Sequence, residues 1–212
     1  MSAKSRLRGL YAITPQALCA QPQALLAAAA AAVRGGAVLL QYRDKRSPPE
    51  RRQALARALL ELCRRSATRL IVNDDVSLAA EVGADGVHLG ATDAPIADAR
   101  TKLGPQALLG ASCGPSLERA RAALALGADY LAFGRFYDSR TKPQAPPADI
   151  AVLRAARAEF SVPLCAIGGI TPANAAPLIA AGADLIAAVE GVFGDPRPCA
   201  VEAAARAYAK LF

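Results

Sequence analysis

The chain has 212 residues, which is enough for one domain with a sizeable hydrophobic core. Its formal net charge of +7 favours anionic partners. The basic residues form neither a long run of like charges nor a ladder with aromatic residues, so we expect no nucleic-acid partner. Small phosphorylated molecules remain as the expected partners.

The cysteines and the apolar stretches indicate the compartment. The five cysteines form no CxxC motif and are Cys19, Cys63, Cys113, Cys165 and Cys199. An odd, scattered set is typical of reduced thiols, so we expect a cytoplasmic protein. The alanine-rich stretch 24–33 is too short to cross a bilayer, and a strand pattern directly follows the basic amino-terminal residues. We therefore expect neither membrane contact nor a signal peptide, and a homo-oligomer remains open.

Short apolar runs alternate with helical patterns along the whole chain. The runs predict strands at 10–13, 38–42, 70–72, 86–89, 108–111, 130–133, 163–167 and 185–189. The helical patterns cover 22–34, 49–66, 76–82, 95–103, 116–126, 150–160, 172–181 and 199–211. Eight such units predict an α/β fold, a single (β/α)8 TIM barrel over residues 1–212. A doubly wound open sheet is the alternative, because the same alternation produces both.

A short repeat supports this organisation. Gly83-Ala84-Asp85, Gly127-Ala128-Asp129 and Gly182-Ala183-Asp184 each lead from a helical pattern into an apolar strand, and Gly36-Ala37-Val38 does so with a valine. Glycine suits the left-handed backbone that commonly ends a helix. Repeated supersecondary units of this kind stack to bury their faces.

Two carboxylates follow neighbouring predicted strands. Asp74 comes directly after the strand at 70–72, and Asp93 lies just beyond the strand at 86–89. Neighbouring strands are about 4.8 Å apart, so the two side chains can share a hard cation such as Mg²⁺. Each aspartate also precedes a helical pattern, and a helix N-cap is the alternative for either one alone. The pair on adjacent strand ends favours a metal site.

Cations gather at other predicted strand ends, where a barrel carries its chemistry. Arg43, Lys45 and Lys142, together with Asn73, suit a polyphosphate bound with Mg²⁺. A solvated basic loop is the alternative. The stretch 139–148, rich in proline and polar residues, predicts a mobile loop over this site.

A second phosphate site is predicted after the seventh strand. Gly168 and Gly169 follow that strand, and Ser139 and Thr141 offer hydroxyls nearby. Main-chain N–H groups at such a position bind phosphate well, although the two glycines also fit a simple tight turn. His88 is the single histidine and lies among core-like residues, which favours a structural role; as a general base it would need a partner.

In this order the strand-end segments resemble the thiamine-phosphate synthase family. The matching segments are LYAITP at 10–15, QYRDK at 41–45, VNDD at 72–75, ADGVHLG at 84–90 with Asp93, GAS at 110–112, YLAFG at 130–134, Thr141-Lys142, and AIGGI at 166–170. The resemblance implies a barrel that joins hydroxymethylpyrimidine diphosphate to a thiazole phosphate carboxylate. Pyrophosphate and CO₂ leave, and thiamine phosphate forms.

The resemblance also implies roles for single residues. Those expected around the pyrimidine diphosphate are Gln41, Tyr42, Arg43, Asp44, Lys45, Asn73, Ser112 and Lys142. Among these, the expected catalytic cations are Arg43, Lys45 and Lys142. Those expected around the thiazole phosphate are Ser139, Arg140, Thr141, Gly168, Val189 and Glu190. Asp74 and Asp93 are expected to hold Mg²⁺.

The implied mechanism is dissociative and passes through a pyrimidine-methyl cation, so it requires no nucleophilic side chain. Four positions depart from the family pattern: Asp44 replaces Glu, Ser139 replaces Thr, Ala91 replaces Gln and Glu190 replaces Ser. We expect the Glu190 carboxylate to turn away from phosphate while its main-chain N–H binds. The alternatives are a non-synthase relative of the same barrel and a sugar-phosphate barrel isomerase.

Overall fold

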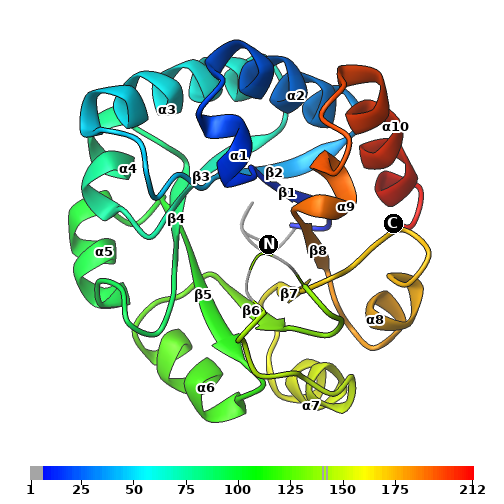
Figure 1. The fold of residues 1–212 in the computed structure, drawn as a ribbon. Coiled ribbons are helices and arrows are strands. Elements are labelled where there is room, and N and C mark those ends of the chain that lie inside the picture. The colour runs from blue at the N-terminus through cyan, green and yellow to red at the C-terminus, as the bar shows by residue number, and fades with distance from the viewer. Residues whose placement is uncertain (1–6, 140, 142) are drawn as a thin grey trace.

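The computed structural model describes residues 7–139, 141 and 143–212. In it, eight parallel strands close into a barrel in chain order, and β8 pairs with β1 (Figure 1). The strands are β1 (Gly9–Ile13), β2 (Ala37–Tyr42), β3 (Arg69–Asn73), β4 (Gly86–Leu89), β5 (Leu108–Gly114), β6 (Tyr130–Gly134), β7 (Leu164–Ile167) and β8 (Leu185–Ala188). The predicted (β/α)8 barrel is confirmed, and the open-sheet alternative is wrong.

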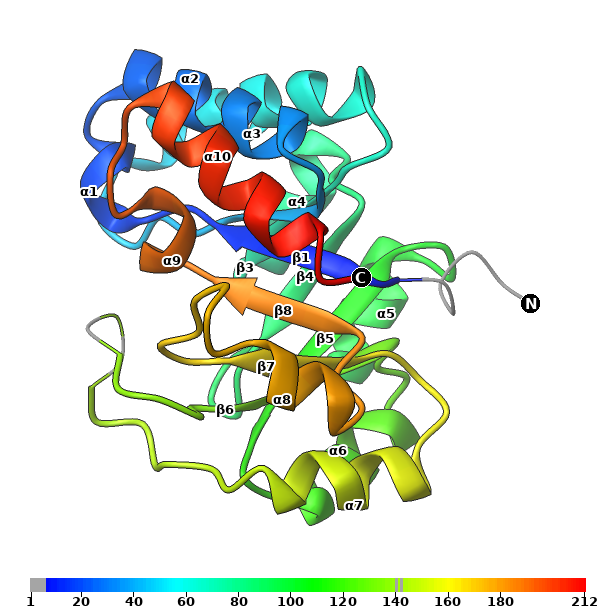
Figure 2. The same ribbon diagram turned by 90° about the vertical axis from the view of Figure 1, so that its right-hand side faces the viewer.

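Helices surround the barrel on the outside, except that the short helices α1 (Gln16–Cys19) and α9 (Glu190–Phe193) lie at one of its ends (Figures 1 and 2). The others are α2 (Pro22–Arg34), α3 (Pro49–Arg64), α4 (Val76–Val82), α5 (Ile96–Leu103), α6 (Leu117–Ala125), α7 (Ala151–Glu159), α8 (Ala176–Ala180) and α10 (Pro198–Ala209). Proline begins α2, α3 and α10, where its missing N–H would have had no intrahelical partner. The strand arrowheads in Figure 2 point to the end that carries α1 and α9, the mouth of the barrel.

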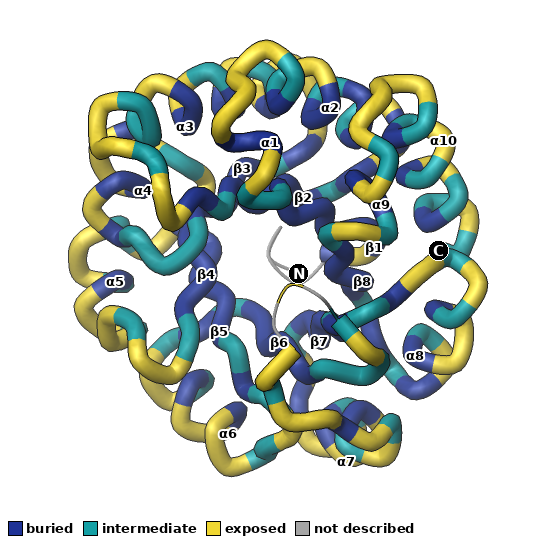
Figure 3. Tube along the Cα trace, in the orientation of Figure 1, coloured by how far each residue is buried: buried dark blue, intermediate teal, exposed yellow. Residues whose placement is uncertain are grey.

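Side chains alternate between two apolar layers along each strand. Tyr11, Leu39 and Tyr130 belong to the cluster inside the barrel, whereas Leu10 and Leu40 pack in the larger cluster between strands and helices. Figure 3 shows the strands buried and the outer faces of the helices exposed. This alternation decides which strand residues reach the interior and the mouth.

The Gly-Ala-Asp repeat ties neighbouring strands together at the opposite end. In three units the aspartate carboxylate accepts a hydrogen bond from a main-chain N–H near the start of the preceding strand. The pairs are Leu70 N–H with Asp85 at 2.7 Å, Leu109 N–H with Asp129 at 2.8 Å and Leu164 N–H with Asp184 at 2.9 Å. Arg100 and Arg157 also pair with Asp129 and Asp184, respectively. The repeat is therefore a set of strand clamps.

Among the described residues, no helix is both long and apolar enough to cross a membrane.

Candidate active site

The two predicted metal-binding carboxylates converge at the mouth, one after β3 and the other after β4. Lys45 joins them, with its Nζ 2.7 Å from Oδ2 of Asp74. Asp93 is a hydrogen-bond neighbour of Asp74. The fold thus brings together a carboxylate pair and a cation that lie far apart in sequence.

The backbone aims Asp74 into this cluster. Its φ of 62° lies in the left-handed region, which a residue with a Cβ adopts at a cost in free energy. Its main-chain N–H donates to the carbonyl of His88 at 2.9 Å, and this bond fixes the turn. Such conformations concentrate at functional sites, where the surrounding structure holds them.

The N-cap alternative is wrong for both aspartates. Asp75, not Asp74, caps α4, and its carboxylate accepts from the N–H of Leu78 at 2.9 Å. Asp93 instead accepts from the N–H of Gly90 at 2.6 Å, and Pro95 occupies the cap position of α5. Asp74 and Asp93 are therefore available for chemistry at the mouth.

The pKa values of the two carboxyl groups shift in opposite directions. Burial raises the pKa of Asp93, and the neighbouring Asp74 raises it further. Burial also pushes the pKa of Asp74 upward, but the hydrogen bond from Lys45 and the contact with Asp93 outweigh this and lower it. The Lys45 ammonium thus occupies a place that attracts positive charge.

This donor set fits Mg²⁺, which one or two carboxylates hold with the help of water and substrate phosphate oxygens. Asp74 and Asp93 supply two carboxylates, and Lys45 acts as a stand-in cation beside them. No group of three or more His, Cys, Asp or Glu side chains forms a metal cage in the described part of the chain.

Asp44 organises the loop that carries the cations. Its carboxylate accepts hydrogen bonds from Gln16 Nε2 at 2.8 Å and from the main-chain N–H groups of Arg46 and Ser47, both at 3.1 Å. Burial alone would raise its pKa, but these bonds hold the pKa well below the usual carboxyl range. Gln16 also accepts from the N–H of Lys45 at 2.8 Å. Asp44 therefore shapes the loop from within.

Gln41 and Tyr42 point to opposite faces of β2. Gln41 is buried inside the barrel and donates from Nε2 to the hydroxyl of Tyr11 at 2.6 Å. Tyr42 packs in the outer cluster and donates to Asp44 at 3.0 Å. The structure therefore does not bring the Tyr42 side chain to the mouth, although sequence reasoning placed it there with Gln41.

Arg43, Asn73 and Ser112 lie at or just beyond the carboxyl ends of their strands, and all three are partly exposed. Asn73 is the last residue of β3 and also contributes to lowering the pKa of Asp74. Ser112 lies in β5, where its Oγ is 2.9 Å from Nε2 of His88. Their role around one substrate stays a prediction.

The predicted phosphate site is built on glycine. Gly168 and Gly169 have φ values of 106° and 61°, and a Cβ on Gly168 would lie 2.3 Å from Cβ of Arg135. The loop after β6 therefore packs directly on this turn, and the N–H of Tyr137 donates to the carbonyl of Gly168 at 3.0 Å. Space and backbone conformation both require glycine at 168.

The remaining thiazole-phosphate candidates lie on two segments. Val189 is the N-cap residue of α9, and Glu190 is its exposed first residue. Ser139 and Thr141 belong to the loop after β6, whereas the predicted residues Arg140 and Lys142 lie outside the described residues. The short helix after β8 was not predicted, yet its first turn lies where barrel enzymes often bind phosphate.

His88 has partners that sequence reasoning did not find. Its Nδ1 lies 3.0 Å from the hydroxyl of Tyr130, which is 2.9 Å from the hydroxyl of Tyr11. With Gln41 at one end and Ser112 at the other, these side chains form a continuous hydrogen-bonded chain, here called the polar relay. The alternation of inward-facing residues was a usable signal, because it places both tyrosines inside the barrel.

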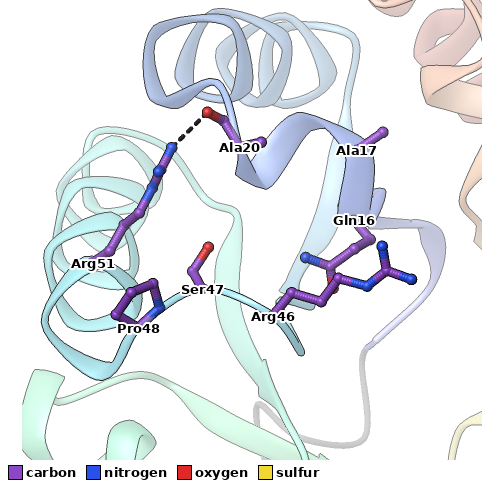
Figure 4. Close-up of a pocket in the computed structure, with 7 residues that line it drawn as sticks. All are labelled: Gln16, Ala17, Ala20, Arg46, Ser47, Pro48 and Arg51. Carbon is purple, nitrogen blue, oxygen red and sulfur yellow. Dashed lines mark hydrogen bonds between the residues drawn. The ribbon is translucent and has the colours of Figure 1, made fainter.

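A cavity of about 560 Å³ lies beside the mouth, between α1 and the start of α3 (Figure 4). Its lining consists of Gln16, Ala17, Ala20, Arg46, Ser47, Pro48 and Arg51. Arg51 donates to the carbonyl of Ala20 at 2.6 Å across it. None of the predicted substrate or metal residues lines this cavity, but Gln16, which does, is hydrogen-bonded to Asp44 and to the N–H of Lys45.

Comparisons with known proteins agree with the sequence resemblance. The family described as Thiamine monophosphate synthase matches residues 10–192. A thiamine-phosphate synthase from Thioalkalivibrio sulfidiphilus is 53% identical over 207 residues, covering 98% of this chain and 96% of the relative. Another from Alcanivorax borkumensis is 50% identical over 207 residues, covering 98% and 95%.

Solved structures give the same picture. Thiamine phosphate pyrophosphorylase from Pyrococcus furiosus aligns with a TM-score of 0.86 at 32% identity, over 99% of this chain and 97% of that one. GGGPS from Thermoplasma volcanium aligns with a TM-score of 0.71 at 16% identity, over 99% of this chain and 95% of that one. The second similarity is one of fold alone.

Proposed function

The chain belongs to the thiamine monophosphate synthase family, and on that premise we propose which of its residues carry the reaction. It is a transferase that forms thiamine phosphate from small phosphorylated substrates. One substrate is hydroxymethylpyrimidine diphosphate, and the other is a thiazole phosphate carboxylate. The products besides thiamine phosphate are pyrophosphate and CO₂.

The convergence of Lys45, Asp74 and Asp93 at the mouth is the observation that most supports these roles. Departure of pyrophosphate develops negative charge on the leaving group. Arg43 and Lys45, with Lys142 from the loop after β6, stabilise that charge more in the transition state than in the ground state. Mg²⁺ held by Asp74 and Asp93 would supply further positive charge to the diphosphate oxygens.

The remaining residues bind and orient the two substrates. Gln41, Asn73 and Ser112 hold the pyrimidine diphosphate, and Asp44 acts on it by fixing the loop. The thiazole phosphate lies against the main chain of Gly168 and the first turn of α9. Its further contacts come from Ser139, Arg140, Thr141, Val189 and the N–H of Glu190.

Bond breaking precedes bond making in the proposed mechanism. The C–O bond to the diphosphate breaks, and the thiazole nitrogen captures the resulting pyrimidine-methyl cation. This chain then needs no nucleophilic side chain. Its task is to exclude water, which would also capture the cation, and the segment that follows β6 is the proposed cover.

The test is a coupling assay with purified protein and both phosphorylated substrates. We expect thiamine phosphate and one pyrophosphate per product with Mg²⁺, and loss of both after chelation. A folded protein that binds the thiazole phosphate but makes no product would instead support a non-synthase relative. The relatives described above do not favour the sugar-phosphate isomerase alternative.

We also propose a cytoplasmic location. All five cysteines are free thiols, and four of them are buried. A protein matured in an oxidising compartment would more typically carry disulfides. The location is tested by fractionating cells that express the chain.

A further inference from the structure

The polar relay crosses the interior of the barrel and connects two proposed substrate-binding residues. Gln41 on β2 is hydrogen-bonded to Tyr11 on β1 at 2.6 Å, and Tyr11 to Tyr130 on β6 at 2.9 Å. Tyr130 is hydrogen-bonded to His88 on β4 at 3.0 Å, and His88 to Ser112 on β5 at 2.9 Å. The two tyrosine side chains are fully buried. The relay thus joins opposite sides of the mouth.

The protons of the relay run in one direction. The Tyr11 hydroxyl accepts from Gln41, so its own proton must go to Tyr130. If Tyr130 donated to Tyr11 instead, the Tyr11 proton would have no acceptor among the described residues, at a high cost in a fully buried place. Burial raises the pKa of both tyrosines, so both hydroxyls stay protonated.

The same direction continues through the histidine. Tyr130 donates to Nδ1 of His88, so that nitrogen carries no proton, and the ring donates from Nε2 to Ser112. Ser112 accepts that bond and keeps its own proton to donate at the mouth. At the other end, the Gln41 amide donates one N–H to Tyr11. The carbonyl oxygen of the same amide is then left to accept a hydrogen bond.

The backbone makes room for the relay at Gly110. A Cβ at this position would lie 2.5 Å from Nδ1 of His88 and 2.0 Å from Cζ of Tyr130. Gly110 has no positive φ, so glycine is needed here for space rather than for backbone conformation. The main chain is therefore shaped around the bond between His88 and Tyr130.

We propose that Tyr11, Tyr130 and His88 are positioning residues that fix, as one unit, an acceptor on Gln41 and a donor on Ser112 at the mouth. This inference rests on the proposed function, since it assumes that Gln41 and Ser112 contact the pyrimidine diphosphate. An amino group on the pyrimidine donates to Gln41, and a ring nitrogen or diphosphate oxygen accepts from Ser112. An oxo group in place of the amino group would meet the Gln41 carbonyl oxygen, lone pair against lone pair. The relay therefore selects an aminopyrimidine.

Steady-state kinetics of Tyr11→Phe test the inference. The substrates are the 4-aminopyrimidine diphosphate and its 4-oxo analogue, each with the thiazole phosphate. Loss of the hydroxyl frees the Gln41 amide to turn, so we expect the amino-over-oxo preference in kcat/KM to fall about tenfold. The KM for the aminopyrimidine should rise, while the KM for the thiazole phosphate stays within about twofold.

Thr68→Val is the matched control. Thr68 also donates a buried hydroxyl hydrogen bond, at 2.7 Å to the carbonyl of Ala37, but it lies at the opposite end of the barrel. The Thr68→Val variant should leave the amino-over-oxo preference in kcat/KM unchanged. If Tyr11→Phe does not unfold cooperatively, Tyr130→Phe takes its place with the same expectation. A folded variant with wild-type preference overturns the inference, whereas an inactive wild type contradicts the proposed function instead.

The single histidine gives a readout that needs no activity. Nitrogen-15 NMR of the chain, freed of any tag that adds histidine, reports the tautomer of His88 directly. We expect the Nε2–H form in the wild type and a mixture of tautomers in Tyr11→Phe. The Nδ1–H form in the wild type would overturn the direction of the relay and with it the proposed selectivity.

Discussion

Nζ of Lys45 lies 2.7 Å from Oδ2 of Asp74, although the two residues come from different strand ends. Lys45 is more than half exposed as a side chain, and the Asp74 side chain is only 26% exposed. The less exposed carboxylate of Asp74 is thus paired with a more exposed cation. We propose that Lys45 exchanges this carboxylate for a diphosphate oxygen during the reaction.

Lys45→Gln should raise the KM for the pyrimidine diphosphate about tenfold and lower kcat, because one charge-assisted contact to the leaving group is lost. Steady-state kinetics with each substrate varied in turn provide the measurement. Arg46→Gln is the control, since Arg46 is the exposed neighbour whose side chain lines the adjacent cavity. Equal effects of the two variants would mean that only general positive charge matters.

Asp93→Asn should keep the bond from the N–H of Gly90 while removing the charge. We expect kcat to fall by about a hundredfold, the order lost when one group that stabilises developing charge is removed. Asp98→Asn makes the same chemical change on the exposed surface of α5 and should have no effect. Wild-type turnover of Asp93→Asn in excess Mg²⁺ would rule out the metal role.

Asp44→Asn should destabilise the protein at neutral pH and change how stability depends on pH. The pKa of Asp44 is lowered in the folded state, so its stabilising contribution is full above the unfolded pKa of about 4 and is lost as pH falls below it. The difference in melting temperature between the wild type and the variant should therefore stay constant above about pH 5 and narrow progressively as pH falls from about 4 toward 2. A constant difference across that range would show that Asp44 acts by shape and not by charge.

Gly168→Ala should raise the KM for the thiazole phosphate by about tenfold or more, since its Cβ would collide with Arg135 and displace the turn. Gly104→Ala separates this effect from backbone strain. Gly104 also has a positive φ, of 81°, but a Cβ there meets nothing within 4 Å. Comparable kinetics for the two alanine variants would contradict a phosphate site at Gly168.

The barrel was predictable because its signals are local. Apolar runs mark the strands, glycines or prolines mark the ends of several helices, and β4 has the predicted bounds Gly86–Leu89. The ends of other elements differ from the prediction. Strand β5 extends to Gly114, three residues past its predicted end, because Ser112 and Gly114 resemble loop residues in the sequence. The helices α1 and α9 were missed, since four residues are too few for a helical period.

The site was predictable only in part. The proximity of Asp74 and Asp93 was predictable because each follows a strand, and the two strands, β3 and β4, are neighbours in the barrel. The partner of His88 was not predictable from spacing, since Tyr130 lies 42 residues away and meets it only once the barrel closes. Tyr42 was misplaced because a five-residue match was treated as one surface, although alternate residues of β2 face opposite ways.

The strand clamps have a consequence for protein engineering. Asp85, Asp129 and Asp184 fasten strand beginnings, whereas the proposed substrate-binding residues lie at strand endings. A library confined to one rim can then be screened for heat tolerance, and a library confined to the other for altered substrates, with little interference between them. The unit at Gly36-Ala37-Val38 lacks the clamp and is a natural first place to graft one.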